Sequence, residues 1–562
     1  MIQRNSIQDF RIPNWSFFVQ DTWRIRPRLT LTYGARYEIV PAPHSLNGKP
    51  FFSLKDYDAV KCTRSLGSST LPPAGSTVCD VGINPLGTPP YPTTWGNIAP
   101  RLGIAYQISQ NPRWATVLRA GFGRFYDTAN NASAAAVGPF SPTVFNRQVG
   151  FPVPAINAQS LAAPAIQKNI SPTSPYSSAA IAAAPDLTLP RTYGFNVALQ
   201  QALGSRQSLT VSYIGGIGRD LIAAAAAFPQ DWGLNGQSNT YYISPTFYGT
   251  ATTLTVFGNY AGSDYHALQA QFQRQVHKGL GALVSYTWSH ALDDASNFNA
   301  GPEFPRSRNR SSSDFDVRQT VAASMVYDAP TPFKRNKLLS AVLGNWSVDP
   351  IYHYQTGLPV NLIAQTTLDT NILTLQRPSV IPGVPIYVYG ADCAAQNGGN
   401  PCPGGWGINA TPVTNFRNSS GALPHPQCEE SILSPLSPTG VVGYGAFCIT
   451  TFDPFASRAP QGNAGRNLLR GFPLRQFDLD VHRDFPVNER LRLRFHANVF
   501  NVLNQPNFSA PQNYLLLPNF GKSTSMMNSS FGTGSISSGG GNNPLYSMGG
   551  PRSVQFALKI MF

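Results

Sequence analysis

The sequence predicts an all-β protein, built as a transmembrane antiparallel β-barrel. Three observations predict this fold class: a composition poor in helix formers, paired segments in which apolar and polar side chains alternate, and connections that are short and long in turn. Charged residues make up 12% of the 562 residues and aromatic residues 11%, and there are 49 glycines and 49 prolines. This composition favours strands and turns over helices.

The sequence holds no candidate for a membrane-spanning helix. The longest uninterrupted apolar segment is 221–228, whereas a spanning helix needs about 20 such residues. The net charge of +14 raises the question of nucleic acid. Basic residues are scattered singly and no zinc-type Cys/His spacing accompanies them, so no nucleic-acid partner is predicted.

The first predicted hairpin runs from Trp15 to Glu38 and turns at Arg26-Pro27-Arg28. Its second strand has an apolar side chain at every other position, namely Leu29, Leu31, Tyr33, Ala35 and Tyr37. Four further hairpins repeat this period of two. They pair 102–106 with 118–122, 193–199 with 209–213, 268–273 with 282–288, and 321–327 with 346–354.

The sixth hairpin pairs 477–481 with 491–499 and indicates the environment of each of its two faces. Arg492, Arg494 and His496 alternate with large apolar residues, and three basic side chains cannot share a dry core. Lipid on one face and water on the other satisfy both sets. A thirteenth and last strand points Val554, Phe556, Leu558, Ile560 and Phe562 outward and Gln555 and Lys559 inward.

Long irregular connections separate the hairpins. In outer-membrane barrels, short turns face the periplasm and long loops face outside, whereas loops this long would count against a compact soluble domain. We predict long extracellular loops at about 41–92, 127–188, 219–260, 291–314, 360–470 and 503–550.

The parity of the strands indicates a partial barrel. Both the first and the last of thirteen strands run from the long-loop side to the short-turn side, whereas single-chain bacterial barrels have even strand numbers. The start, MIQRNSIQDFRIPNW, also shows no signal peptide. We therefore expect residues 1–562 to be the C-terminal portion of one outer-membrane β-barrel domain, with the N-terminal part lost or encoded elsewhere.

Six cysteines lie in loop-like segments, which suits an oxidising compartment. Proximity in the sequence favours three disulfides, although connectivity stays open and unpaired thiols are the alternative. The candidate pairs are Cys62 with Cys79, Cys393 with Cys402, and Cys428 with Cys448.

Six segments resemble the barrel of TonB-dependent outer-membrane receptors, especially the Oar-like branch. They are FFVQDTWRIRPRLTLTYGARYE, VLRAGFGRFYD, SYTWSHALDD, YHYQTGLPVN, NVFNVLNQPNF and PRSVQFALKIMF. The resemblance implies a 22-stranded barrel in the lipid of a Gram-negative outer membrane, closed by an N-terminal plug domain. It also implies energy-coupled uptake of an extracellular ligand such as a siderophore, a carbohydrate or another oligomer.

This sequence shows neither a plug nor a TonB box, so contact with the TonB complex is expected only through the missing plug domain. The resemblance further implies that the barrel-assembly machinery reads the last strand. The residues of that signal are Phe556, Leu558, Ile560 and Phe562.

Chemistry-bearing motifs are absent from the sequence. Without a G-x-S-x-G elbow, an H-E-x-x-H pair or a P-loop, we predict no enzyme, no catalytic residues, no cofactor and no metal site. Substrate-binding residues are not identifiable. His290 with Asp293, Asp294, Asp314 and Asp316 suggests a hard-cation site, but a solvated strand end is the favoured interpretation.

Aromatic residues at strand ends, among them Trp15, Trp23, Tyr126 and Trp288, suit either stacking on a ligand or a membrane-interface girdle, which is favoured. Two other functions remain alternatives to a receptor: a passive outer-membrane porin or surface adhesion scaffold, and a soluble all-β binding protein. The soluble protein would need a second layer to cover the apolar face.

Overall fold

The architecture is seen in a computed structural model. It describes residues 2–5, 10–46, 53–58, 82–85, 88–127, 144–147, 180–227, 254–296, 309–330, 344–366, 375–415, 419–428, 441–449, 462–486, 488, 491–515, 517–527 and 548–561.

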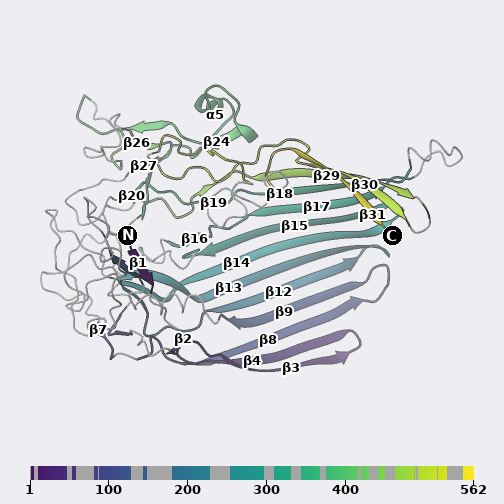
Figure 1. The fold of residues 1–562 in the computed structure, drawn as a ribbon, viewed down its shortest axis with the longest axis horizontal. Coiled ribbons are helices and arrows are strands. Elements are labelled where there is room, and N and C mark those ends of the chain that lie inside the picture. The colour runs from purple at the N-terminus through teal and green to yellow at the C-terminus, as the bar shows by residue number, and fades with distance from the viewer. Residues whose placement is uncertain are drawn as a thin grey trace.

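The main sheet contains thirteen strands that follow one another in chain order, each antiparallel to the next (Figure 1). The predicted strand number and order are confirmed. The strands are β3 (Trp15–Arg26), β4 (Leu29–Val40), β8 (Thr94–Ser109), β9 (Thr116–Tyr126), β12 (Arg191–Ala202), β13 (Gln207–Ala227), β14 (Leu254–His277), β15 (Leu280–Asp293), β17 (Gln319–Asp328), β18 (Trp346–Gln355), β29 (Leu474–Pro486), β30 (Arg492–Phe500) and β31 (Ser553–Met561). Within the described residues the sheet is open between β3 and β31.

The short connections lie at one end of the sheet, on the right in Figure 1, where the chain also ends. Strands β14 and β15 are joined by Lys278-Gly279, whose φ angles are 51° and 76°. Two successive positive φ angles define the turn that matches the twist of a two-residue hairpin. A Cβ at Gly279 would lie 2.3 Å from the Asp328 carbonyl oxygen, so this position requires glycine.

The strand register keeps each face of the sheet continuous. Leu102 opposes Phe122 at the β8–β9 pair, and Phe495 opposes Leu558 at the β30–β31 pair. Directly opposed residues share a face, so the apolar sets predicted from alternation line up across the whole sheet. Many of these side chains are exposed, including Trp288 at 51% and Phe556 at 68%.

The described helical residues include no segment with the length and hydropathy needed to cross a membrane. The described α-helix, α5 (Gly390–Gln396), has seven residues.

The prediction that 360–470 is irregular is wrong over much of its length. Described residues 359–366, 375–415, 419–428, 441–449, 462–470, 508–515 and 517–527 fold together into what we call the loop lobe, at the end of the sheet opposite the short turns (Figure 1). Its elements are α5, the 3-10 helix η4 (Pro403–Gly405), and strands β19 (Pro359–Val360), β20 (Gln365–Thr366), β21 (Leu375–Gln376), β22 (Ser379–Val380), β23 (Tyr387–Tyr389), β24 (Trp406–Ile408), β25 (Pro412–Thr414), β26 (Val441–Tyr444), β27 (Phe447–Cys448) and β28 (Leu469–Arg470).

The loop lobe has its own apolar core, which includes Val360, Ile381, Ile408, Val442, Phe447, Leu469, Leu515 and Phe520. These residues come from segments more than 150 positions apart. Such short elements have no periodicity that reveals them in sequence, because their stability comes from mutual burial.

The predicted loop at 219–260 is also too long, because β13 continues to Ala227 and β14 begins at Leu254. The apolar segment 221–228 does not alternate, so it does not look like a strand. Its alanines are buried instead: Ala223 and Ala224 are 1% and 6% exposed, opposite Gly258 and Phe257. Likewise β15 continues into the predicted loop 291–314, and β16 (Ser311–Ser312) pairs with its end.

Short paired strands also lie before the first hairpin and in the predicted loops 41–92 and 127–188. One of them, β11, pairs with β14 in parallel. These strands are β1 (Ile2–Asn5), β2 (Phe10–Arg11), β5 (His44–Ser45), β6 (Leu54–Lys55), β7 (Gly82–Ile83), β10 (Val144–Arg147) and β11 (Ala180–Ala183).

Candidate functional site: the polar face and the loop lobe

The polar face of the sheet has a neutral, hydrogen-bonding centre. Alternation on β13, β14 and β15 places hydroxyl and amide side chains side by side around a hollow of about 270 Å³. The polar residues that line it are Thr210, Ser212, Gln269, Gln271, Ser285 and Thr287. A second hollow of about 280 Å³ lies next to it, lined by residues such as Ser289, Phe315 and Thr320. This surface can hydrogen-bond a polar solute through neutral groups.

Charged groups gather on the same face farther along the sheet. Arg494 donates to both carboxylate oxygens of Asp484, from Nε at 2.5 Å and Nη2 at 2.8 Å. Nearby, the His496 Nδ1 lies 3.0 Å from Asp480 Oδ2, and the rings of His496 and His482 stack with centroids 5.0 Å apart.

Sequence reasoning placed Arg494 and His496 on this face but missed Asp480 and His482. The available signal was the alternation Asp478-x-Asp480-x-His482 within a hairpin whose other strand carries His496.

The acidic residues at the outer end of β15 are paired with arginines, so the structure gives no support to the hard-cation interpretation. Asp293 and Asp314 both pair with Arg466, the latter at 3.2 Å. Asp294 pairs with Arg310 at 3.4 Å. Asp316 pairs with Arg470, and His290 Nε2 lies 3.3 Å from the Ser312 hydroxyl.

The favoured interpretation, a solvated strand end, is wrong for three of these carboxylates. Asp293, Asp294 and Asp316 are 2%, 6% and 1% exposed. Burial of carboxylates requires charged or hydrogen-bonding partners, and the arginines that supply them lie up to 173 positions away in the sequence.

These arginines attach the loop lobe to the sheet. Besides Asp293 and Asp314, Arg466 reaches the Asn309 carbonyl from Nε at 3.1 Å. The backbone N–H of Arg470 donates to the Tyr387 hydroxyl at 2.8 Å. Burial raises the pKa of Tyr387, which keeps its hydroxyl neutral in this contact. The loop lobe is therefore held on the end of β15 by buried charge pairs.

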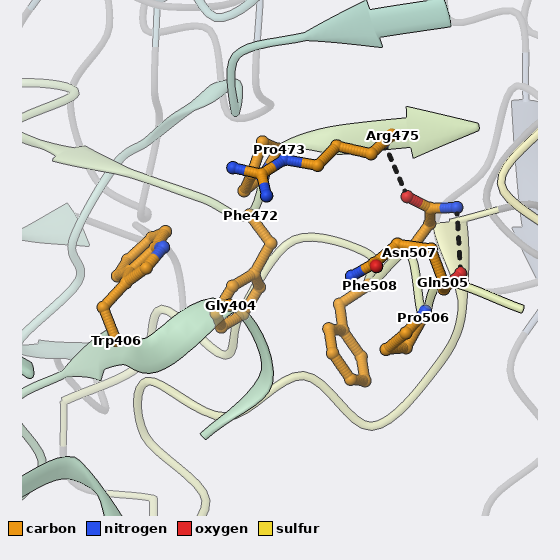
Figure 2. A pocket seen from close by; sticks show the side chains of 9 residues that line it. All are labelled: Gly404, Trp406, Phe472, Pro473, Arg475, Gln505, Pro506, Asn507 and Phe508. Carbon is orange, nitrogen blue, oxygen red and sulfur yellow. Dashed lines mark hydrogen bonds between the residues drawn. The ribbon is translucent and has the colours of Figure 1, made fainter. Parts of the chain in front are cut away.

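A small pocket lies where the loop lobe meets β29. Figure 2 shows the residues that line it, among them the aromatic rings of Trp406, Phe472 and Phe508 and the side chain of Arg475. Its volume is about 20 Å³, which is room for about one water molecule. The ring of Phe472 packs against Trp406 and Phe508, with centroids 5.4 and 5.5 Å away. The pocket is a packed junction and not a binding cavity for a ligand of ordinary size.

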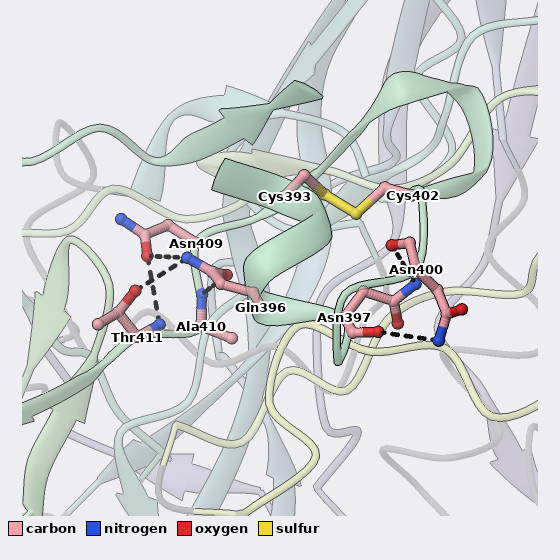
Figure 3. Close-up of a disulfide and its surroundings, with 8 residues drawn as sticks. All are labelled: Cys393, Gln396, Asn397, Asn400, Cys402, Asn409, Ala410 and Thr411. Atoms are coloured by element: carbon pink, nitrogen blue, oxygen red, sulfur yellow. Dashed lines mark hydrogen bonds between the residues drawn. A yellow bond between two sulfur atoms is a disulfide. The ribbon is translucent and has the colours of Figure 1, made fainter. Parts of the chain in front are cut away.

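Two of the disulfides considered from sequence are present in the loop lobe. Cys393 on α5 is joined to Cys402 (Figure 3), and Cys428 is joined to Cys448. Cys428 and Cys448 are 1% and 0% exposed, inside the core of the loop lobe. The pair of Cys62 and Cys79 lies outside the described residues.

The candidate assembly residues lie on the exposed apolar face. Phe556, Leu558 and Ile560 on β31 are 68%, 64% and 56% exposed, and the ring of Phe556 stacks on Phe495 at 5.9 Å. Phe562 is outside the described residues.

The candidate girdle residues follow the same pattern, and all four face the apolar side. Trp15 and Trp23 on β3 are 61% and 55% exposed. Trp288 opposes Leu268, and Tyr126, at the end of β9, opposes Arg191.

An antiparallel sheet with a continuous exposed apolar face and a polar, charged opposite face is the arrangement of an outer-membrane β-barrel, with lipid outside and water inside. The chain belongs to the outer membrane beta barrel domain family, whose model matches residues 2–555. The protein is therefore located in the outer membrane.

Solved structures similar to the chain are outer-membrane transporters and receptors. The outer membrane transporter YddB from Escherichia coli is 9% identical with a TM-score of 0.40, over 98% of this chain and 54% of that one. The ferripyoverdine receptor of Pseudomonas aeruginosa is 8% identical with a TM-score of 0.38, over 99% and 39%. The ferric-catecholate import receptor Fiu from E. coli is 10% identical with a TM-score of 0.38, over 99% and 45%.

The chain thus spans about half or less of the length of these proteins. No curated protein matches it. The family assignment rests on the family model.

Proposed function

We propose that the protein is the C-terminal portion of a receptor barrel for TonB-dependent uptake of an extracellular ligand, a siderophore, carbohydrate or other oligomer. The observation that supports this most is the folded loop lobe. Ion pairs of Arg466 and Arg470 attach it to the sheet at the end opposite the short turns. A loop of this length that is folded, disulfide-bonded and anchored suits ligand recognition. The six segments that resemble TonB-dependent receptors point to the same function.

The polar hollow on β13 to β15 suits the passage of a neutral polar ligand. Its side chains offer hydroxyl and amide groups without a net charge, and such groups exchange hydrogen bonds with a polyol or a peptide-like ligand. In the proposed receptor, energy reaches the barrel through a plug domain, which contacts the TonB complex. The barrel itself contacts outer-membrane lipid through the apolar face.

Uptake in whole cells tests the proposal. Cells that express the full-length protein are offered labelled oligosaccharides and ferric siderophores, with and without a functional TonB complex. We expect saturable uptake of one class, lost when TonB is removed. Uptake that is unsaturable and independent of TonB would indicate a passive porin, and surface binding without uptake would indicate an adhesion scaffold.

A further inference from the structure

We propose that Asp480, His482 and His496 form a binding site for one divalent transition-metal ion on the polar face of the sheet. The site lies near the middle of β29 and β30. It does not depend on which ligand the proposed receptor takes up.

The register of the hairpin brings the three residues together. His482 directly opposes His496, and Asp480 is two residues earlier on β29, hence on the same face. One ligand atom from each residue lies within 4.8 Å of the ligand atoms of the other two. Three metal-binding side chains, one carboxylate and two imidazoles, are thus brought together by strand pairing, without a flexible loop.

One ring nitrogen of His482 lacks a hydrogen bond, and a bound metal ion would account for this. His482 is 8% exposed, and its Nδ1 is buried without a hydrogen-bond partner. That atom lies 3.4 Å from Asp480 Oδ2 and 3.5 Å from Asp349 Oδ2. Buried polar atoms normally have partners, and an exception calls for an explanation such as an ion.

The separations from His482 Nδ1 to the two carboxylates match those between ligands of one metal. With metal–ligand bonds of about 2.0–2.2 Å, tetrahedral ligands lie about 3.3–3.6 Å from each other. The distances from His482 Nδ1 to the two carboxylates fall in this range, and His496 Nδ1 lies 3.0 Å from Asp480 Oδ2. The other ring nitrogen of His496, Nε2, is also buried without a hydrogen-bond partner.

The donor set and its charge select the class of ion. Two neutral imidazoles and the carboxylates of Asp480 and Asp349 together balance a charge of 2+. Imidazole suits zinc, copper, nickel and cobalt, whereas calcium and magnesium prefer all-oxygen sites. Arg494, two residues from His496 on the same face, is paired with Asp484, so its positive charge is offset.

Copper(II) is the probe for this site, because its electron paramagnetic resonance spectrum counts the bound nitrogens. The full-length protein in detergent is titrated with Cu²⁺, alongside variants His482→Asn and His496→Asn. His353→Asn is the matched control, because His353 is on the same face but opposes Gln476. We expect one Cu²⁺ per chain with splitting from two nitrogens. Since loss of an outer partner alone weakens metal binding 10–100-fold, each ligand variant should weaken it at least about 10-fold and the control should not.

Equal affinity in the wild type and in both ligand variants, or a wild-type spectrum with fewer than two nitrogens, would overturn the site. Heat-modifiable migration on gels shows whether each variant is folded. If a histidine variant does not fold, the nitrogen count of the wild-type spectrum decides the question alone.

Discussion

Arg494 on β30 donates two parallel hydrogen bonds to the carboxylate of Asp484 on the neighbouring strand β29, from Nε at 2.5 Å and from Nη2 at 2.8 Å. The pair lies on the polar face, and both side chains are about one-quarter to one-third exposed. Bidentate geometry makes such a pair stronger than a typical surface ion pair. Arg494 is thus paired within its hairpin and is not a free charge on the polar face.

Reversal of Arg494 alone should therefore destabilise the last hairpin. Arg494→Glu puts a carboxylate against Asp484 and should lower the free energy of unfolding by about 1.5–3 kcal/mol, the range for a hydrogen bond to a charged group. The exchange Asp484→Arg with Arg494→Glu should restore part of the loss. Urea unfolding from lipid vesicles measures this double-mutant cycle, and additive single effects would show that the pair contributes nothing.

Neighbouring residues on β12 should differ sharply in their tolerance of charge. Val197 is on the apolar face and 48% exposed, and Asn196 beside it is exposed on the polar face. Val197→Arg should cost about 2–4 kcal/mol near the bilayer midplane, whereas Asn196→Arg should cost little. The same vesicle assay measures both, and equal costs would contradict the assignment of the two faces.

Loss of Arg466 should release the loop lobe from the sheet. Arg466→Met leaves the buried carboxylate of Asp293 without its guanidinium, and breaking a buried pair costs about 3–5 kcal/mol. We expect faster cleavage of the loop lobe in limited proteolysis while the barrel stays heat-modifiable. Arg206→Met, at a short turn, is the control. Unchanged cleavage would mean that other contacts hold the loop lobe.

The exposed face of β31 should govern assembly in the membrane. If the assembly machinery reads this face, Phe556→Asn and Leu558→Asn should reduce the heat-modifiable protein recovered from outer membranes. Gln555→Asn, on the opposite face of the same strand, should leave it unchanged. Recovery that falls equally in all three variants would point to a general effect on strand pairing.

Much of the sheet could be predicted because its information is local. Alternation such as Leu29 to Tyr37 marks a strand and its two faces within a few residues. Alternation does not reveal segment 221–228 as a strand, because its alanines pack against β14 and are apolar at consecutive positions. Alternation does not reveal the strands of the loop lobe either, because each is too short to show a repeating pattern.

The candidate site was only half predictable. Alternation identified His496 and Arg494 as polar-face residues, and the same alternation within the hairpin carries Asp480 and His482, but nothing local places Asp349 beside them. That juxtaposition follows from the register of β18, β29 and β30, with more than 100 residues of chain between β18 and β29.

The thirteen strands and the apolar and polar faces of the sheet can be predicted from residue order alone, because side-chain direction in a strand alternates with position. The partners of individual charges become visible only in the folded protein. Asp293 and Asp316 became buried partners of Arg466 and Arg470, and strand pairing brought Asp480, His482 and His496 together. Charge pairing depends on distance in space, and residues far apart in the chain supply it.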